Sequence, residues 1–182
     1  VKKVTDKISG EIFKNYKVDK LIRSDDNIRV IIGNEYVDYD QVVLASHADQ
    51  SLRMIEKPTE QEKNILEKFN YVKNEAYLHT DKRLMPHKKR AWSSWNSVSD
   101  GEKTCITYWL NKLQNLDTSK DYFLTLNPIY KINENSVIKK VDFTHPYLNS
   151  KNTALQKDLR LIQGKKRTWF CGSYFGYGFH ED

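Results

Sequence analysis

The 182-residue sequence has few of the residues that stabilise small secreted scaffolds or mark membrane proteins. It contains two cysteines, four prolines and seven glycines. Without a CxxC pair, neither a disulfide framework nor a zinc site is expected. Cys105 and Cys171 fall in apolar, strand-like runs, a pattern typical of buried free thiols in a reducing compartment. No apolar run is long enough to span a bilayer, and no signal peptide is recognisable. These absences predict a cytoplasmic protein without a transmembrane segment.

The familiar catalytic and nucleotide-binding signatures are missing as well. The chain has no P-loop, no dinucleotide GxGxxG and no GxSxG elbow around a serine. Its histidines lie one per segment, without the i, i+4 or hairpin spacing of metal ligands, so no metal site is predicted. They are His47, His79, His87, His145 and His180.

The composition is that of a folded domain with a modest excess of positive charge. The aromatic fraction is 12% and the charged fraction 30%, which argues against disorder. The net charge of +6 is spread along the chain, with concentrations at residues 82–90 and 165–167. No nucleic-acid-binding module accompanies them, so we interpret both as solvated surface and predict no nucleic-acid partner.

The first third of the chain indicates short strands followed by helices. A helix is expected to end near Gly10, and residues 16–23, 27–32 and 35–40 favour an antiparallel meander. Residues 41–47 are apolar without alternation, which predicts a strand buried on both faces. Two helices are expected at residues 48–56 and 59–69, the second opened by a capping box of Thr59 and Glu62.

The rest of the chain favours a large antiparallel sheet, one helix and a last buried strand. The five expected sheet strands cover residues 74–81, 90–98, 103–114, 121–128 and 136–148. The helix covers residues 152–165 and the last strand residues 168–172. The sequence therefore predicts an α+β fold with mixed and antiparallel sheets.

Two strand ends carry residue types suited to a ligand. Glycines follow the last strand at Gly172, Gly176 and Gly178, and glycine allows close approach of backbone N–H groups to a phosphate or ring. An aromatic turn packed on a core would give the same pattern. Ala45 and Ser46 close the other apolar strand and could leave room for a cofactor, although Ser46 or Asp49 could also cap the next helix.

An aromatic cluster is expected on two adjacent strands of the large sheet. Trp95 and Asn96 lie on one strand, and Tyr108 and Trp109 on the next. Aromatic side chains on one face could form the wall of a substrate cavity, with the asparagine as a polar contact. Tryptophans in the core of a sheet packed against helices would produce the same spacing.

Several stretches resemble one family over nearly the whole chain and in one order. The matching segments are YDQVVLASHADQSLRMI, RAWSSWN, TYWLNKLQ, TLNP, the HP pair and, most specifically, IQGKKRTWFCGSYFGYGFHED. They are similar to the C-terminal half of FAD-dependent oxidoreductases of the flavin-containing amine oxidase superfamily. That group includes bacterial NAD/FAD-binding proteins and the region before the methyltransferase part of plant cyclopropane fatty acid synthases.

The resemblance implies a Rossmann-like FAD domain with an inserted substrate domain. On this chain, residues 1–47 and 165–182 would belong to the FAD domain, and residues 48–164 to the substrate domain. Val18 would contact adenine through its main chain, with Ala45, Ser46 and His47 along the cofactor crevice. Gly172 and Ser173 would lie near the ribityl-pyrophosphate, and a helix beginning at Gly178, Phe179 and His180 would face the flavin.

Two departures limit what the resemblance implies. The GxGxxG unit of the family is absent from these residues, and Ser173 replaces the commoner acidic residue. We therefore expect an excised fragment that holds no FAD alone. The whole protein would oxidise a small-molecule substrate, amine or lipid-like, with no assignable catalytic residue. The alternative left open by the residues is a cofactor-free, β-rich module whose aromatic surface binds a ligand or partner.

Overall fold

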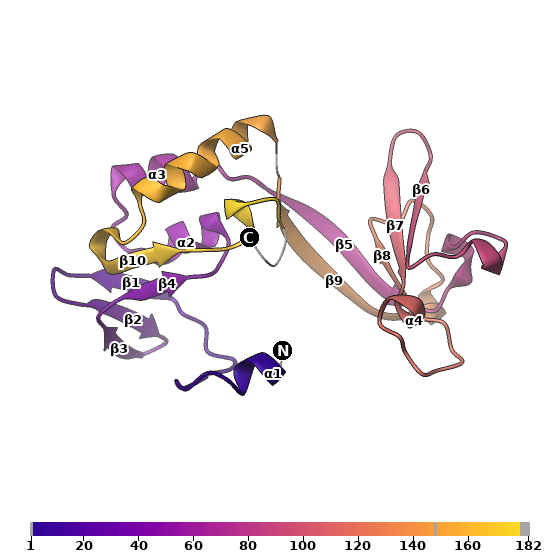
Figure 1. Ribbon diagram of the computed structural model, residues 1–182, viewed down its shortest axis with the longest axis horizontal. Coiled ribbons are helices and arrows are strands. Elements are labelled where there is room, and N and C mark those ends of the chain that lie inside the picture. Colours follow the sequence, from indigo (N-terminus) through magenta and orange to yellow (C-terminus); the bar gives the residue numbers. More distant parts are fainter. Residues whose placement is uncertain (1, 148, 179–182) are drawn as a thin grey trace. The chain divides into compact units, whose positions relative to one another are not determined.

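The computed structural model describes residues 2–147 and 149–178, which belong to two compact units. Unit 1 comprises Val1–Asn70 and Pro146–Asp182, and unit 2 comprises Tyr71–His145 (Figure 1). The fold is α+β, with antiparallel sheets and a parallel pairing of two short strands. The units divide at different residues from the expected domains, whose boundaries fall at 47/48 and 164/165. The assignment of either unit to cofactor or substrate remains a prediction.

Unit 1 contains the meander expected from the sequence. Its strands β1 (Lys20–Arg23), β2 (Ile28–Ile32) and β3 (Glu35–Tyr39) pair antiparallel in that order. Gly33 has a φ of +61° in the turn between β2 and β3, a conformation that glycine adopts without strain. The prediction of a three-stranded meander is confirmed.

A second sheet of unit 1 joins two strands that are far apart in sequence. Strand β4 (Val42–Leu44) pairs parallel with β10 (Thr168–Phe170), and Trp169 lies opposite Val43. Leu44 and Phe170 are buried, whereas Val43 is 62% and Trp169 42% exposed. The expectation that this strand is buried on both faces is therefore wrong, because only one face of the described pair is covered.

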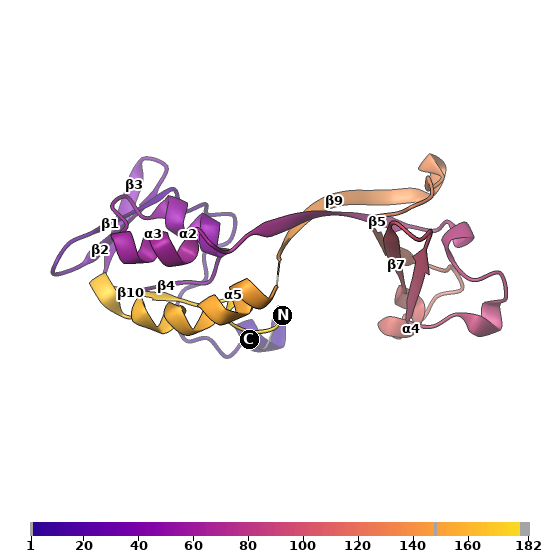
Figure 2. The same ribbon diagram turned by 90° about the horizontal axis from the view of Figure 1, so that it is seen from above.

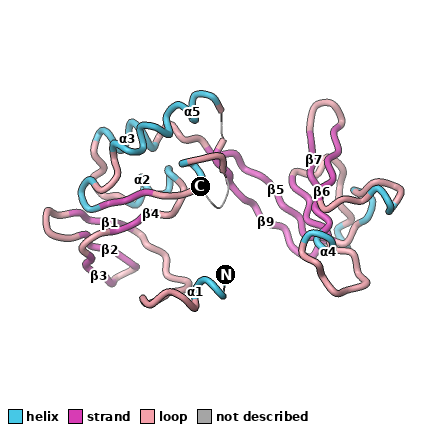
Figure 3. The backbone as a smooth tube through the Cα atoms, viewed as in Figure 1, coloured by secondary structure: helices cyan, strands magenta, loops and turns pink. Residues whose placement is uncertain are grey.

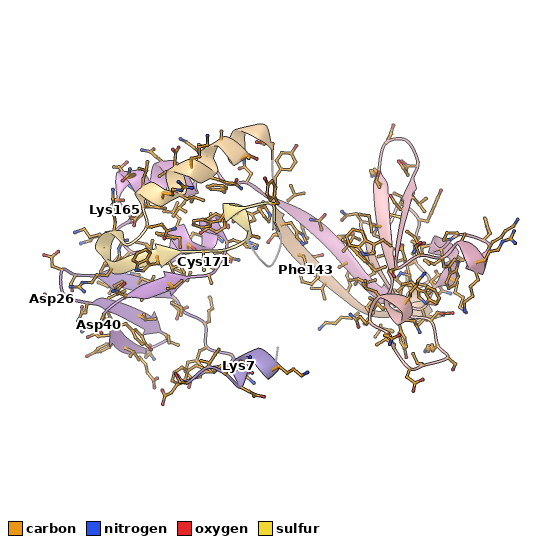
Figure 4. All side chains as sticks on the ribbon, in the orientation of Figure 1. Lys7, Asp26, Asp40, Phe143, Lys165 and Cys171 are labelled. Carbon is orange, nitrogen blue, oxygen red and sulfur yellow. The ribbon has the colours of Figure 1, made fainter. Side chains whose placement is uncertain are left out.

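The same open face explains the position of one thiol. Cys171 follows β10 (Figure 4) and is exposed, contrary to the prediction. Cys105 is buried, as expected. Side chains alternate along an extended chain, so Cys171 points to the side of Trp169 rather than to that of Phe170.

Helix α3 of unit 1 begins where the sequence places its cap, and Figure 3 shows the helices of the described chain. Helix α2 covers Ala48–Met54 and α3 covers Glu60–Leu66. The Thr59 hydroxyl accepts a hydrogen bond from the Glu62 N–H at 3.2 Å, and the Glu62 carboxylate accepts one from the Thr59 N–H at 2.7 Å. This capping box was predicted. Helix α5 (Ser150–Leu155) continues into a 3₁₀ helix, Gln156–Leu161, and α1 covers only Lys2–Thr5, shorter than expected.

Unit 2 is built on one five-stranded sheet of order β6-β7-β8-β5-β9. The strands are β5 (Tyr71–His79), β6 (Trp95–Ser99), β7 (Thr104–Trp109), β8 (Phe123–Leu126) and β9 (Val137–Pro146). Strands β5 and β9 run side by side over most of their length (Figure 2). The largest differences from the predicted bounds are that β6 begins at Trp95 and that β7 gives way to helix α4 (Leu110–Leu113).

The core of unit 2 lies on one face of this sheet. Met85, Trp92 and Phe123 form a buried cluster against which Trp109 packs. The rings of Trp92 and Trp109 meet edge to face, with centroids 5.3 Å apart. None of the helices within the described ranges has the length and apolar content needed to cross a bilayer.

Candidate functional site

The carboxyl ends of β4 and β10 lie side by side in unit 1. The two strands are parallel and in register, and the pairing continues past them, because the Cys171 N–H donates to the Leu44 carbonyl at 3.0 Å. Residues 45–47 and 172–173 therefore leave the sheet at the same edge. In open α/β sheets, this is the edge at which ligands bind.

Two adjoining pockets open near this edge. One, of about 410 Å³, is lined by polar groups that include Lys17, Asp19, Gln50 and Arg53. The other, of about 320 Å³, is lined mainly by apolar side chains. Three residues, Val18, Ser46 and Met54, line both pockets, and Ala45 lines the second. The structure thus brings Val18, Ala45 and Ser46 together at a bipartite site, apolar on one side and polar on the other.

Charges around the polar pocket are arranged in pairs. Arg53 contacts Asp49 at 2.9 Å, and Lys17 contacts Asp19 at 3.7 Å. Asp19 also accepts a hydrogen bond from the Gly33 N–H at 2.7 Å. All four of these charged side chains are partly or largely exposed, so each pair contributes little to stability. The two cations are nevertheless close enough to the pocket to contact an anionic ligand.

Ser46 and His47 also form the start of helix α2. The hydroxyls of Ser46 and Ser51 are 2.8 Å apart, and Ser51 is fully buried. The His47 N–H donates to the Gln50 side-chain oxygen at 3.2 Å. The capping role considered for Ser46 is therefore not seen in this form, since its hydroxyl bonds a side chain of the helix, and His47 is the N-cap.

Gly172 lies close to the main chain of Ser46. A Cβ placed on Gly172 would come within 3.7 Å of the Ser46 carbonyl and within 3.2 Å of the Tyr174 ring. The φ of Gly172 is +142°, a value that strains any residue with a side chain. Ser173 begins a 3₁₀ helix, Ser173–Phe175, and Gly178 is the last described residue of the chain. The predictions for Phe179 and His180 fall outside the described residues.

A buried ion pair links β1, α3 and the start of β10, at the end of β10 opposite to this edge. Arg23, at the end of β1, donates to both carboxylate oxygens of Glu62 in α3, at 2.6 and 2.8 Å. The same guanidinium contacts the Thr168 hydroxyl of β10 at 3.4 Å. Burial alone would raise the pKa of Glu62, but the hydrogen bonds from Arg23 and the Thr59 N–H outweigh it and lower the pKa. This pair was not predicted, because its partners are 39 residues apart.

The four residues of the expected substrate wall do not share one face of the unit 2 sheet. Asn96 pairs with Thr107 across β6 and β7, on the face that carries Trp109 and the core. The Asn96 amide donates to the Ser93 and Thr107 carbonyls at 2.7 and 3.2 Å. Trp109 donates from its indole to Asp121 at 3.1 Å. Both side chains are thus used in holding unit 2 together.

Trp95 and Tyr108 lie on the opposite face. They are directly paired between β6 and β7, and their rings meet edge to face with centroids 5.1 Å apart. Trp95 is 62% exposed. Of the predicted wall, only this pair is therefore available to a ligand on an open surface of unit 2.

A chain of buried polar groups crosses the core face of the sheet. The Asp81 N–H donates to His79 Nδ1 at 3.1 Å, which leaves His79 Nε2 as a donor to the Thr125 hydroxyl at 2.7 Å. Thr125 in turn contacts the Thr107 hydroxyl at 2.8 Å. Burial lowers the pKa of His79, against the raising effect of Asp81, and favours the neutral ring. The spacing of these residues in the sequence did not predict this series of hydrogen bonds.

Asp121 is a second polar centre of unit 2. Its carboxylate contacts Lys82 and Lys89 at 2.9 and 3.4 Å and accepts the Trp109 indole N–H. Burial would raise its pKa, but the two lysines lower it. Lys82 and Lys89 remain 62% and 63% exposed, so the basic stretch 82–90 keeps the expected solvated surface while these two lysines contact Asp121. In the described part of the chain, no three histidine, cysteine or acidic side chains gather as metal ligands do.

Comparisons with solved structures show which known folds this chain resembles. No family model and no curated protein matches the sequence. A CLA-producing fatty acid isomerase from P. acnes matches with a TM-score of 0.67 and 14% identity, over 98% of this chain and 47% of that chain. A cyclohexylamine oxidase from Brevibacterium oxydans IH-35A matches with a TM-score of 0.55 and 10% identity, over 91% and 45%. A redesigned putrescine oxidase matches with a TM-score of 0.57 and 7% identity, over 96% of this chain and 46% of that chain.

With sequence identities of 7–14%, these similarities concern the fold. The chain spans less than half the length of each of these structures. Its fold resembles that of amine oxidases and of a fatty acid isomerase over nearly all of its own length.

Proposed function

We propose that the chain is part of an FAD-dependent oxidoreductase of the amine oxidase kind, and that unit 1 supplies one side of its FAD site. The observation that carries the proposal is the bipartite site formed by Val18, Ala45 and Ser46 at the carboxyl ends of β4 and β10. The fold likeness to cyclohexylamine oxidase and putrescine oxidase supports it.

The residues present suit the adenosine end of such a cofactor. An apolar pocket of about 320 Å³ offers contact to a planar base, and the polar pocket beside it offers Gln50 and two cations to the attached sugar and phosphate. Gly172 has no side chain to obstruct close approach to the main chain at this edge. We assign Val18 to adenine, Ala45, Ser46 and His47 to the crevice, and Gly172 and Ser173 to the ribityl-pyrophosphate. Gly178, Phe179 and His180 are assigned to the flavin ring.

The chemistry belongs to the cofactor and the geometry to the protein. FAD, when bound, accepts a hydride from a substrate C–H bond. Unit 1 would bind and orient the adenosine end, and unit 2 would present an apolar surface that excludes water from the substrate. No side chain described here is assigned as a proton acceptor, and a flavin oxidation of this kind does not require one from this chain.

The FAD proposal is tested by filling the apolar pocket. Ala45 is exposed, so Ala45→Leu should reduce the flavin-to-protein ratio of the full-length enzyme several-fold while the fold is retained. Ala154→Leu, at an exposed alanine of α5 in the same unit, is the matched control and should leave flavin content unchanged. Equal flavin content in both variants would contradict the assignment.

The 182-residue chain alone offers a second measurement. Because no GxGxxG segment occurs in it, we expect the purified chain to be colourless. Flavin absorbance that co-purifies with the chain would count against a shared site.

A cofactor-free binding module is the competing function. The 62% exposure of Trp95 beside Tyr108 favours it, since an open aromatic pair is suited to a ligand or partner. The binding-module function would be favoured if the full-length protein purified without flavin and did not bind added FAD.

A further inference from the structure

The open face of the unit 2 sheet carries a continuous row of uncharged side chains. The strand registers place Trp95 opposite Tyr108, Tyr108 opposite Leu124, and Leu124 opposite Leu78. Ile106 and Leu126 are paired in the next row of the same face. We call these six residues the apolar strip: Leu78, Trp95, Ile106, Tyr108, Leu124 and Leu126.

The dimensions of the strip suit an extended chain rather than a compact ligand. It crosses β6, β7, β8 and β5, so three strand spacings give a length of about 14 Å. Two rows of alternate residues give it a width of about 7 Å. Five of its side chains are partly exposed and Trp95 is largely exposed, so a bound chain could remove apolar surface from water along the whole row.

The charge beside the strip is positive. Lys140 lies over the Tyr77 ring, with its ammonium 5.0 Å from the centroid, and Tyr77 faces away from the strip. Alternation along β9 then places Lys139 on the face of the strip, beside the strand that carries Leu78. Lys139 makes no ion pair with any of the described side chains. Its charge is therefore available to an anionic group.

Lys120 adds a second cation near the same face. Its ammonium lies 5.9 Å from the Tyr122 ring centroid, and Tyr122 directly precedes β8, two residues before Leu124. A ligand with an ammonium head would meet positive charge here and would lose hydration without a carboxylate in the strip to replace it. A carboxylate head would be attracted instead.

We infer that the apolar strip binds the unbranched hydrocarbon chain of a fatty-acid-like substrate, with its carboxylate toward Lys139. This rests on the proposed function, in which unit 2 binds the substrate, and it selects the lipid-like class over the amine class. The strip lies on unit 2 alone, so the binding can be measured without flavin.

Calorimetric titration of the 182-residue chain with monomeric dodecanoate and dodecylammonium tests the inference. The two probes share a chain and differ in head charge, and we expect dodecanoate to bind at least about tenfold more tightly. Octanoate should bind at least about tenfold more weakly than dodecanoate, because each buried methylene strengthens binding about three- to fourfold. Equal affinity for both heads, or no dependence on chain length, would overturn the inference.

Variants locate the binding. Trp95→Ala should weaken dodecanoate at least about fivefold, and it should fold normally because Trp95 is 62% exposed. Lys139→Glu should abolish the preference for dodecanoate over dodecylammonium. The matched controls are Ile138→Ala, at a 52% exposed position on the other face of β9, and Lys157→Glu in unit 1, and neither should change the affinity. Binding that is unchanged by Trp95→Ala and Lys139→Glu in a folded protein would place the ligand elsewhere and refute the assignment.

The outcomes separate this inference from the FAD proposal. If Ala45→Leu lowers flavin content but dodecanoate does not bind, the strip is not the substrate surface and the FAD assignment stands. If dodecanoate binds the strip while flavin content is indifferent to Ala45→Leu, the lipid site stands and the FAD assignment fails.

Discussion

The buried pair of Arg23 and Glu62 should be the most sensitive point of unit 1. Their side chains are 5% and 1% exposed, so water cannot replace either partner. Glu62→Gln keeps the volume and the amide can still accept the Thr59 N–H, but the guanidinium loses its counter-charge. Removal of one member of a buried pair costs about 3–5 kcal/mol, and we expect a loss of about 3 kcal/mol or more from unit 1.

The pair's own contribution can be isolated by a double-mutant cycle. Arg23→Met leaves Glu62 buried and unpaired and should cost a similar amount, whereas the double variant removes both charges and should cost less than the sum. Hydrogen–deuterium exchange is the suitable assay, because peptides from β1 and α3 report unit 1 and peptides from β7 and β8 report unit 2. Protection should fall in the first set and stay constant in the second.

The stabilisation by the pair also has a defined pH dependence. The pKa of Glu62 is lowered in the folded state, so the native carboxylate holds its proton less tightly than the unfolded one. The contribution is complete above the unfolded pKa of about 4.5 and is lost as the pH falls through the folded value. A Glu62→Gln protein within about 0.5 kcal/mol of wild type at neutral pH would refute this reasoning.

Two further predictions concern unit 2. His79 has a lowered pKa, so below about pH 6.5 the unfolded chain binds a proton that the folded chain does not, and stability should fall by up to about 1.4 kcal/mol per pH unit until the folded pKa is reached. Exchange of β5 and β8 amides measured on acidification should show this, and acid-insensitive protection between pH 7 and 5 would contradict it. Asp121→Asn should cost about 1–2 kcal/mol, since Lys82 and Lys89 lose their shared carboxylate but are themselves mostly exposed. Urea unfolding measures this loss of stability, with Asp117→Asn at an exposed position as the control. Equal unfolding midpoints for the two variants would contradict a stabilising role of Asp121.

Local signals in the sequence predicted local structure well. Thr59 and Glu62 are three residues apart, and their spacing alone indicated the capping box that the structure shows. The meander followed from short β-rich runs and the turn at Gly33, and the α+β class followed from the order of elements. Each of these depends on residues within a few positions of one another.

Features that depend on what covers a surface were not predictable. The apolar run through Val43 looked buried on both faces, but its exposure depends on whether another layer lies over β4. The expected wall of Trp95, Asn96, Tyr108 and Trp109 was split because the face of each side chain depends on strand register. Register is fixed by long-range pairing rather than by composition.

The strand-end pattern suggested a ligand near Ala45, Ser46 and Gly172, whereas FAD itself and the role of Val18 rested only on the resemblance. Val18 carries no chemical signature of its own, and the structure places it with Ala45 and Ser46 around the same pocket. The parallel pairing of β4 and β10, more than 120 positions apart, brings Gly172 close to Ser46. Arg23 and Glu62, which link β1, α3 and the start of β10, gave no signal because a buried pair is defined by its surroundings.

The hydroxyl and imidazole chain in unit 2 has a consequence for how its sheet is assembled. A shift of one residue between strands exchanges the two faces of a sheet. In unit 2 both faces carry large apolar side chains, so hydrophobicity alone would allow either face to turn inward. A slipped sheet would bring His79 and Thr125 to the surface and leave their partners unsatisfied. The buried polar groups of the core face thus determine which face of the sheet is packed inward. The apolar face can therefore remain exposed to solvent without a shift in strand register.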